Sequence, residues 1–512
     1  MCRDGYLGRG WLRWSPLVAL SAAGACSPSG SGGPSGEVVT PVVVAPPPPA
    51  GGNAEPPQSV PALVANTDPA ASAEFIDPND QPVVALPPVR RRGLLQKQVT
   101  CGEGSTTSVS GTVYIPSGEL ALYNAMVYVP DAELRPLTAG ASCGCEISGE
   151  PIASALTDAN GRFVLKNVPV GDNIPLVVQV GEWRREFDIG TVEACVDKPI
   201  ADQTLRLPSR QSEGNIPKMA VATGTVDAVE CLVRKLGIAP EEFTHPSRDG
   251  RVNLFAGYFG AERFADSTNG GAFFPPAGAL WADLPSLQAY DIVLLSCDGR
   301  APDEGGTEDK DELSRQAMFD YLNGGGRVFA SHFQEVWFQQ GPAPFPDIAE
   351  FTFDPDRLDG LTAQVVTTFP KGEAMAEWAR ANGAADANGQ VEILGAERTI
   401  VRENTNYAQR WLASEEPQTV QYLSANTPLG VPEQQQCGRF VLSDIHVSPG
   451  RFAPDGEAYI DDFSEPSTGF PDGCITSGLS PQEKLLAFML FDISACVVPD
   501  SQAPVAAPVT IR

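Results

Sequence analysis

The stretch GGGRVFASH, Gly324–His332, decides the fold of the largest part of this chain. Three glycines lead into a short apolar run, and the run ends on one of only 3 histidines in 512 residues. Open α/β sheets build their active sites from residues that follow the carboxyl ends of parallel strands. The stretch therefore predicts a buried strand that delivers His332 to such an edge.

Strand and helix patterns alternate on both sides of this stretch. The strand patterns are KMAVATG, RVNLFAG, DIVLLSC and GRFVLSDIH, and the helix patterns are TVDAVECLVRKLGI, DKDELSRQAMFDYLNGGG and SPQEKLLAFMLFDISAC. Continuous apolar strands separated by helices are typical of a parallel sheet covered on both faces. We predict an α/β, flavodoxin-like parallel-sheet domain over residues 215–498, with an insertion at about 341–432 whose strands the pattern does not place.

A smaller folded segment precedes it, over residues 100–208. Short runs of β-branched and aromatic residues alternate there with turn signals such as TDANGRF, which predicts a small antiparallel β-sandwich. The string SGTVYIPSG, NAMVYVP and ASALTDANGRFVLKNVPVGDNIPLVVQV resembles a carboxypeptidase regulatory-like domain, which is a prealbumin-like sandwich. The resemblance implies a structural or adhesive module without catalytic residues, in a multidomain protein.

The amino-terminal residues 1–26 have the features of an export signal. A basic start is followed by the short apolar run SPLVALSAAGA, and small residues precede Cys26. The pattern resembles a bacterial lipoprotein signal peptide, in which this cysteine carries the lipid. With Ser27 after the cysteine, the resemblance implies export and lipid anchoring to the outer membrane, on its periplasmic or cell-surface side. Cleavage nearby without lipidation is the alternative.

The regions beside the folded parts are biased in composition. Residues 27–99 are rich in Pro, Gly, Ser and Ala, which predicts a disordered tether, and residues 499–512 are predicted to be a disordered tail. The net charge is −29, with 64 acidic against 35 basic residues. Such a charge disfavours nucleic acids and anionic membrane surfaces as partners, so the lipid anchor is the predicted link to the membrane.

Eleven cysteines favour an oxidising compartment. The cysteines of the CGC insertion are expected to pin that loop to the sandwich through Cys101 or Cys195. Cys297 ends an apolar strand and is expected to be an inert buried thiol. The pairing is left open, and the disulfide candidates are Cys101, Cys143, Cys145, Cys195, Cys231, Cys437, Cys474 and Cys496.

The larger domain also resembles a known superfold. The run AYDIVLLSCDG, MFDYLNGGGRVFASHF and GRFVLSDIHVS is similar to the glutamine amidotransferase-like superfold, and within it to the trehalose-utilisation-type branch. The resemblance implies that a nucleophile follows the second of these strands and that His446 is its partner. This chain has Ser331 or His332 in place of the cysteine, and Ser448 where an acidic residue is needed. The resemblance therefore argues against amidotransferase chemistry.

The two histidines together indicate a functional site more strongly than either does alone. His332 and His446 both end parallel strands, so both are expected at one edge of the sheet. With Asp298, Asp444 or Glu335 they could bind a metal ion or perform acid–base chemistry. The alternative is that each histidine satisfies nearby backbone groups.

Two further patterns have a structural and a functional interpretation each. Phe333, Trp337 and Phe338 are spaced for one helical face, which favours core packing over a platform for a sugar ring. Two acidic loops favour solvated surface over calcium binding. Their carboxylates are Asp354, Asp356, Asp359, Asp455, Glu457, Asp461 and Asp462.

We favour a non-enzymatic surface lipoprotein that binds a glycan or another envelope component and needs no cofactor. The alternative is a hydrolase-like enzyme that uses His332, His446 and a carboxylate, with a divalent metal as one option, on a carbohydrate-derived substrate. The enzyme needs the histidines within about 3–7 Å of each other or of a shared carboxylate, in an open pocket.

Overall fold

The computed structural model describes residues 91–510, except 138, 145–146, 300–309, 353–357, 359, 447–468, 473 and 475–477. The predicted signal peptide, lipidated Cys26 and most of the tether lie outside the described residues. All the described residues belong to one compact unit. No helix of the described part is long and apolar enough to cross a membrane.

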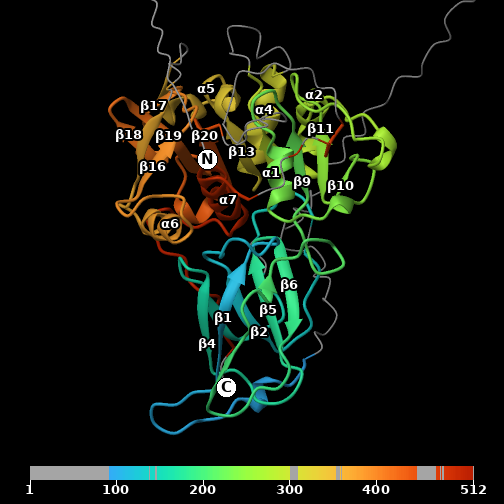
Figure 1. The fold of residues 1–512 in the computed structure, drawn as a ribbon, viewed down its shortest axis with the longest axis vertical. Coiled ribbons are helices and arrows are strands. Elements are labelled where there is room, and N and C mark those ends of the chain that lie inside the picture. Colours follow the sequence, from blue (N-terminus) through green and yellow to red (C-terminus); the bar gives the residue numbers. More distant parts are fainter. Residues whose placement is uncertain are drawn as a thin grey trace, which may run out of the picture. The chain divides into compact units, whose positions relative to one another are not determined.

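Residues 108–206 form the predicted sandwich of two four-stranded sheets (Figure 1). One sheet holds β1 (Ser108–Tyr114), β4 (Arg162–Lys166), β7 (Asp197–Pro199) and β8 (Leu205–Arg206). The other has the order β3 (Pro151–Leu156), β2 (Met126–Pro130), β5 (Pro175–Val180), β6 (Trp183–Asp188). The sandwich is not wholly antiparallel as predicted, because β1 pairs in parallel with both β7 and β8.

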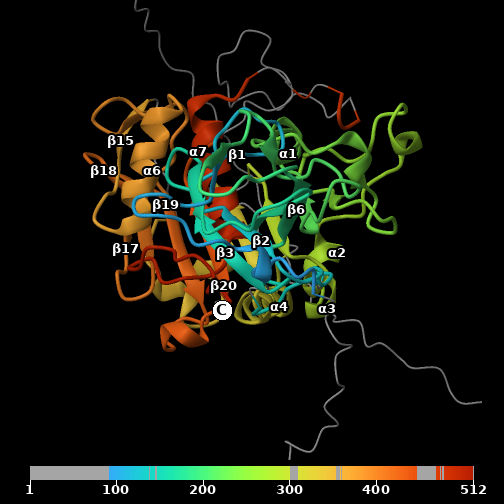
Figure 2. The ribbon, with the colours of Figure 1, turned by 90° about the horizontal axis from the view of Figure 1, so that it is seen from below.

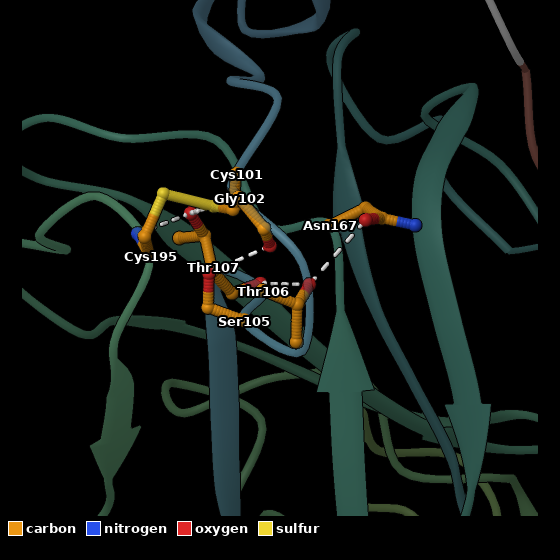
Figure 3. The surroundings of a disulfide bond; sticks show 7 residues. All are labelled: Cys101, Gly102, Ser105, Thr106, Thr107, Asn167 and Cys195. Atoms are coloured by element: carbon orange, nitrogen blue, oxygen red, sulfur yellow. Dashed lines mark hydrogen bonds between the residues drawn. A yellow bond between two sulfur atoms is a disulfide. The ribbon is translucent and has the colours of Figure 1, made fainter.

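One disulfide closes the sandwich on itself (Figure 3). Cys101 is bonded to Cys195, 94 residues away, which joins the chain before β1 to the chain before β7. Thr107 supports this joint, since its Oγ1 accepts a hydrogen bond of 2.9 Å from the backbone of Cys195. The bond therefore ties both ends of the sandwich sequence together.

The second part contains a ten-stranded mixed sheet. Its order is β10 (Phe243–Thr244), β11 (Val252–Phe255), β9 (Met219–Ala222), β12 (Ile292–Leu295), β13 (Arg327–Ser331), β20 (Gly438–Ser443), β19 (Gln418–Thr427), β18 (Gln409–Glu415), β15 (Leu361–Val365) and β16 (Gln390–Ile393). The strands from β10 to β20 are parallel, whereas those from β20 to β16 are antiparallel. The prediction of a parallel sheet therefore holds for one half only.

The antiparallel half explains the insertion predicted at 341–432. Its strands β15, β16, β18 and β19 extend the parallel sheet beyond β20, and β14 (Ala349–Phe351) pairs with β17 (Ile400–Glu403) beside it. The first four of these strands extend the sheet from β20, which comes after all of them in the chain. The local sequence therefore did not indicate which strand they pair with.

Helices cover both faces of the sheet, as predicted (Figure 2). Leu294 and Phe329 face α1 (Val229–Lys235) and α7 (Pro481–Ser494) in one apolar cluster, while Val293 and Val328 face the other. The second face is covered by α2 (Gly278–Trp281), α3 (Leu284–Gln288), α4 (Glu312–Asn323) and α5 (Val336–Gln339). This alternation follows from side chains that point to opposite faces along each strand.

The remaining helix, α6 (Pro370–Ala381), packs in the first cluster through Met375 and Trp378. Short 3₁₀ helices lie at Leu95–Lys97, Pro240–Glu242, Asn269–Gly271, His332–Glu335, Phe345–Asp347 and Glu433–Gln435. The long α7 begins with a capping box, in which Ser480 and Glu483 satisfy each other's backbone groups. The helix therefore begins where the predicted helix pattern SPQEKLLAFMLFDISAC begins, at Ser480 and Pro481.

Two segments predicted to be disordered make specific contacts where they are described. Leu94 is buried and donates its backbone N–H to the carboxylate of Asp131, so the chain packs on the sandwich from residue 91. In the tail, Asp500 forms an ion pair of 3.0 Å with Arg439, and Thr510 donates a 2.8 Å hydrogen bond to Pro151. The sequence did not predict these contacts, because both segments are rich in small residues and proline, a composition typical of disorder.

The CGC loop joins the two parts instead of closing on the sandwich. Cys143 is bonded to Cys437 of the α/β part, and Gly140 donates a 2.8 Å hydrogen bond to Asp291. The expectation that Cys143 pairs with Cys101 or Cys195 is wrong. Cys145 lies outside the described residues. Within the α/β part, Cys231 is bonded to Cys474, and Cys496 is also disulfide-bonded.

Candidate functional site

Four polar residues follow the carboxyl ends of four neighbouring parallel strands. Asp227 follows β9, Cys297 follows β12, His332 follows β13 and His446 follows β20. The register sets Ser331 opposite Ser443, so β13 and β20 end at the same level. The predicted edge therefore exists and brings both histidines together, with ring centroids 5.0 Å apart.

His332 occupies a strained backbone position directly after β13. Its φ is 45°, a left-handed conformation that residues other than glycine rarely adopt. Such strain persists where surrounding structure enforces it, and it is found often at functional sites. The turn directs the imidazole toward Cys297, with Nδ1 3.5 Å from Sγ. Nε2 is buried and has no hydrogen-bond partner among the described residues.

His446 is held by a carboxylate from the other side of the edge. Its Nδ1 lies 3.1 Å from Oδ2 of Asp227, and the same oxygen accepts a hydrogen bond from the Ser331 hydroxyl. Asp227 is fully buried. A hydrogen bond from Nδ1 to a carboxylate fixes the tautomer, so Nε2 of His446 is the nitrogen that faces the site.

Glu397 lies between the two imidazoles. Its Oε1 is 3.6 Å from Nε2 of His446, and its Oε2 is 3.9 Å from Nε2 of His332. The backbone places it there, because Ala396 forms a bridge with Ile445, the residue before His446. Glu397 comes from the insertion, and it gives the two histidines the shared carboxylate that the enzyme interpretation requires.

Asp444, a sequence candidate, holds the Glu397 loop. Its carboxylate accepts backbone hydrogen bonds from Thr399 at 2.9 Å and Ile400 at 2.8 Å, and a third from the Thr399 hydroxyl. Its carbonyl accepts a 2.9 Å hydrogen bond from the backbone of Glu397. Asp444 therefore positions Glu397, and its carboxylate is taken up by the backbone of the Glu397 loop.

The electrostatic environments of the two histidines differ. Burial, with His446 nearby, holds the pKa of His332 well below its ordinary value. Burial also opposes the charged form of His446, but the carboxylates of Asp227 and Glu397 outweigh it and raise the pKa of His446 to about 9. The edge therefore holds one imidazole that resists protonation and one that favours it.

Cys297 is a buried free thiol, as expected. Burial, and then the charge of Asp227, raise the pKa of Cys297 well above its ordinary value. Its Sγ accepts a hydrogen bond of 3.3 Å from the backbone of Gly299. The ligand atoms of Cys297, His332 and His446 all lie within 4.8 Å of one another, so this trio is one of the groups that could hold a metal ion.

Asp298 and Glu335, also sequence candidates, belong to a neighbouring polar cluster. Asp298 forms a buried ion pair of 2.7 Å with Lys310, whose ammonium lies 5.5 Å from the ring centre of Trp281. Burial, and then the charge of Asp444, raise the pKa of Glu335 well above its ordinary value.

The aromatic run after His332 is mainly core, as the sequence favoured. Trp337 and Phe338 are fully buried, and Trp337 packs on Trp281 with ring centroids 5.1 Å apart. Phe333 is half-buried and stacks on His332 with centroids 3.8 Å apart. The seven carboxylates of the two acidic loops lie outside the described residues.

The sequence interpretation missed Asp227 and Glu397. Asp227 carried the same signal as the histidines, since it follows a predicted strand in KMAVATGTVD, and could have been found. Glu397 carried none, because it lies in the segment whose strands could not be placed. His245, which carried no signal, lies in a turn against Ser247, with Nδ1 2.8 Å from Oγ.

No protein-family model and no curated protein matches the chain. Among solved structures, a ThuA-like protein from Bacteroides uniformis is similar, at 11% identity and a TM-score of 0.26, over 54% of this chain and 91% of that chain. A ThuA-like protein from Parabacteroides merdae is similar at 10% identity and a TM-score of 0.26, over 46% and 80%. A type II cohesin–X–dockerin complex from Acetivibrio cellulolyticus is similar at 18% identity and a TM-score of 0.15, over 26% and 84%. The two ThuA-like names agree with the trehalose-utilisation-type resemblance, and at these TM-scores they carry no argument about function.

Proposed function

We propose that the α/β part is a hydrolytic enzyme whose centre is formed by His332, His446 and Glu397. The observation that carries the proposal is the convergence of two imidazoles, from adjacent parallel strands, on one carboxylate. The edge on which they converge is where α/β sheets bind their substrates. The strained backbone of His332 supports the same conclusion, because the fold maintains an unfavourable conformation to point that ring at the others.

The chemistry would be the attack of a water molecule held among these three groups. The water oxygen forms a bond to an electrophilic carbon of the substrate, and the bond from that carbon to the leaving oxygen breaks. One proton of the water passes to Glu397 and then to the leaving oxygen. Asp227 contributes by holding His446 in one orientation, as the third group does in catalytic triads.

A carbohydrate-derived substrate is supported by what borders the centre. The half-buried ring of Phe333 lies directly on His332, and an aromatic face beside polar groups suits a sugar ring. Asp298, next in the chain to Cys297, forms with Lys310 a charge pair near the same edge. A sugar offers both an apolar face and many hydroxyls to such a site.

The non-catalytic alternative has one specific observation in its favour. His332 and His446 are each only 4% exposed, and an enzyme has to admit its substrate. In that case the protein would bind a glycan or an envelope component through another surface. Both functions are compatible with export and lipid anchoring at Cys26, which we also propose. The disulfides support an oxidising compartment for the folded part.

The test is hydrolysis of p-nitrophenyl glycosides and p-nitrophenyl esters by the full chain. We expect turnover that falls at least 100-fold in kcat/KM in His446→Ala and Glu397→Gln, the loss typical for a group that acts on the transferred proton. His245→Ala, which removes the third histidine, should retain wild-type activity. Equal activity in all three variants would refute this centre, and no turnover of either substrate class would favour the binding role.

A further inference from the structure

We infer that His332, His446 and Glu397 hold one divalent transition-metal ion, bound by Nε2 of each imidazole and by the carboxylate. The inference takes its catalytic meaning from the proposed function, since the ion would be what activates the water. It stands on separate observations, namely the tautomers, the spacing of the ligand atoms and the type of donor atoms.

The hydrogen bonds behind the imidazoles leave one nitrogen of each facing the centre. Nδ1 of His446 donates to Asp227, so Nε2 is the nitrogen directed toward Glu397, and it would lose its proton on binding an ion. For His332, Nδ1 has Cys297 as its partner, and Nε2 is the buried atom without a hydrogen bond among the described residues. A buried polar atom without a partner is costly, and such a group in a native structure needs an explanation such as an ion.

The two carboxylate oxygens of Glu397 each face one imidazole, at separations longer than a hydrogen bond. Hydrogen bonds between nitrogen and oxygen end near about 3.2 Å. The separations here are longer: Oε1 of Glu397 lies 3.6 Å from Nε2 of His446, and Oε2 lies 3.9 Å from Nε2 of His332. Tetrahedral ligands at the usual zinc distances lie about 3.3 Å apart. Side-chain shifts of a few tenths of an ångström would close that difference, and an ion held there would be bound by both oxygens of Glu397.

The donor atoms select the class of metal. Calcium and magnesium prefer oxygen ligands, whereas imidazole suits zinc, iron, nickel and copper. Two imidazoles and one carboxylate form the protein ligand set of catalytic zinc sites that keep an open position for water. Asp227 then fits as the outer carboxylate that orients a metal-bound histidine, which is a recurring arrangement in such sites.

Cys297 is the competing ligand, because its Sγ also lies within 4.8 Å of the imidazole atoms. We assign it to the outer shell for a geometric reason. Its contact is with Nδ1 of His332, and one imidazole cannot direct both of its nitrogens at a single ion. Binding through Nδ1 would leave Nε2 buried without a partner, whereas binding through Nε2 uses both nitrogens of His332.

The test is metal binding by the full chain after dialysis against a chelator. Isothermal titration with Zn²⁺ should give one tight site per chain, and Ca²⁺ should give none at the same concentrations. Glu397→Gln should weaken Zn²⁺ binding at least tenfold and His446→Ala at least 100-fold. Glu397→Gln keeps the shape of the side chain, and the urea midpoint of each metal-free variant reports whether it is folded. His245→Ala is the matched control and should bind as wild type.

Cys297→Ser separates the two ligand sets. We expect it to retain tight Zn²⁺ binding, and we expect the Co²⁺-substituted wild type to lack a thiolate-to-cobalt charge-transfer band. Loss of binding in Cys297→Ser together with such a band in the wild type would overturn the ligand set. The absence of a tight Zn²⁺ site in the folded wild type would overturn the metal itself.

The outcomes also separate this inference from the proposed function. Hydrolysis that survives the chelator but is lost in His446→Ala would refute the metal and leave the hydrolase. A tight Zn²⁺ site lost in Glu397→Gln, without hydrolysis of either p-nitrophenyl substrate class, would support the metal and refute the hydrolase as proposed.

Discussion

Replacing Asp444 tests how the fold holds Glu397 in place. In Asp444→Ala, the backbone N–H groups of Thr399 and Ile400 and the Thr399 hydroxyl all lose their acceptor. Asp444 is only 1% exposed, so water cannot simply replace the carboxylate. Each buried group left without a partner costs about 1–3 kcal/mol. Allowing for relaxation of the loop, we expect the free energy of unfolding to fall by about 3–6 kcal/mol.

The assay is urea unfolding at pH 8, because burial raises the pKa of Asp444 to about 6 and the carboxylate is ionised there. Thr399→Val is the matched control, since it removes only the hydroxyl donor and should cost about 1–2 kcal/mol. A second measurement separates positioning from stability. Under conditions where the variant is still folded, Asp444→Ala should also weaken Zn²⁺ binding, because Glu397 is no longer held. A loss of stability below about 1 kcal/mol, or unchanged Zn²⁺ affinity, would refute this reasoning.

Three further outcomes follow from the structure. Asp227→Asn should weaken Zn²⁺ binding by about 10–100-fold, measured by titration, because the carboxylate that orients His446 is lost; an unchanged affinity would contradict this role. Asp500→Ala should lower the free energy of unfolding in urea by about 3–5 kcal/mol, because Asp500 and Asp492 together neutralise the buried cations Arg439 and Lys371, and one positive charge would remain uncompensated. A truly disordered tail would give no change. Removal of the metal by chelation should lower the melting temperature of the wild type and leave that of Glu397→Gln nearly unchanged.

The sequence predicted half of the main sheet and half of the site. A strand that ends in a polar residue can be recognised from the local sequence. Because the carboxyl ends of parallel strands lie at the same edge of a sheet, the proximity of His332 and His446 could be predicted. Glu397 could not, because its position depends on the bridge between Ala396 and Ile445. That bridge can be predicted only when the positions of the strands in the antiparallel half of the sheet are known.

The roles of the acidic candidates were misjudged for the same reason. Asp444 lies two residues before His446, and in a regular strand the two side chains would point to the same side. The chain leaves the regular strand at Ser443, so the alternation stops, and Asp444 binds the backbone at Thr399 instead. Asp298 follows Cys297 directly but is engaged by Lys310. Local periodicity cannot predict which buried cation a carboxylate will meet.

The stretch Gly324–His332 also contacts the loop that comes from the sandwich. A substitution of Gly325 tests how much this contact contributes. Its φ is 103°, and a Cβ there would overlap the backbone of Ser142 and Cys143 in the loop from the sandwich. Gly325→Ala should therefore lower the free energy of unfolding by at least about 1–3 kcal/mol, the cost of such strain alone. Gly360→Ala is the control, because its φ is also positive at 88° but nothing lies within 4 Å of the added Cβ. The difference between the two variants in urea unfolding measures the contact itself. Equal losses would mean that the sandwich loop gives way, and that β13, which ends at His332, is not supported by the sandwich.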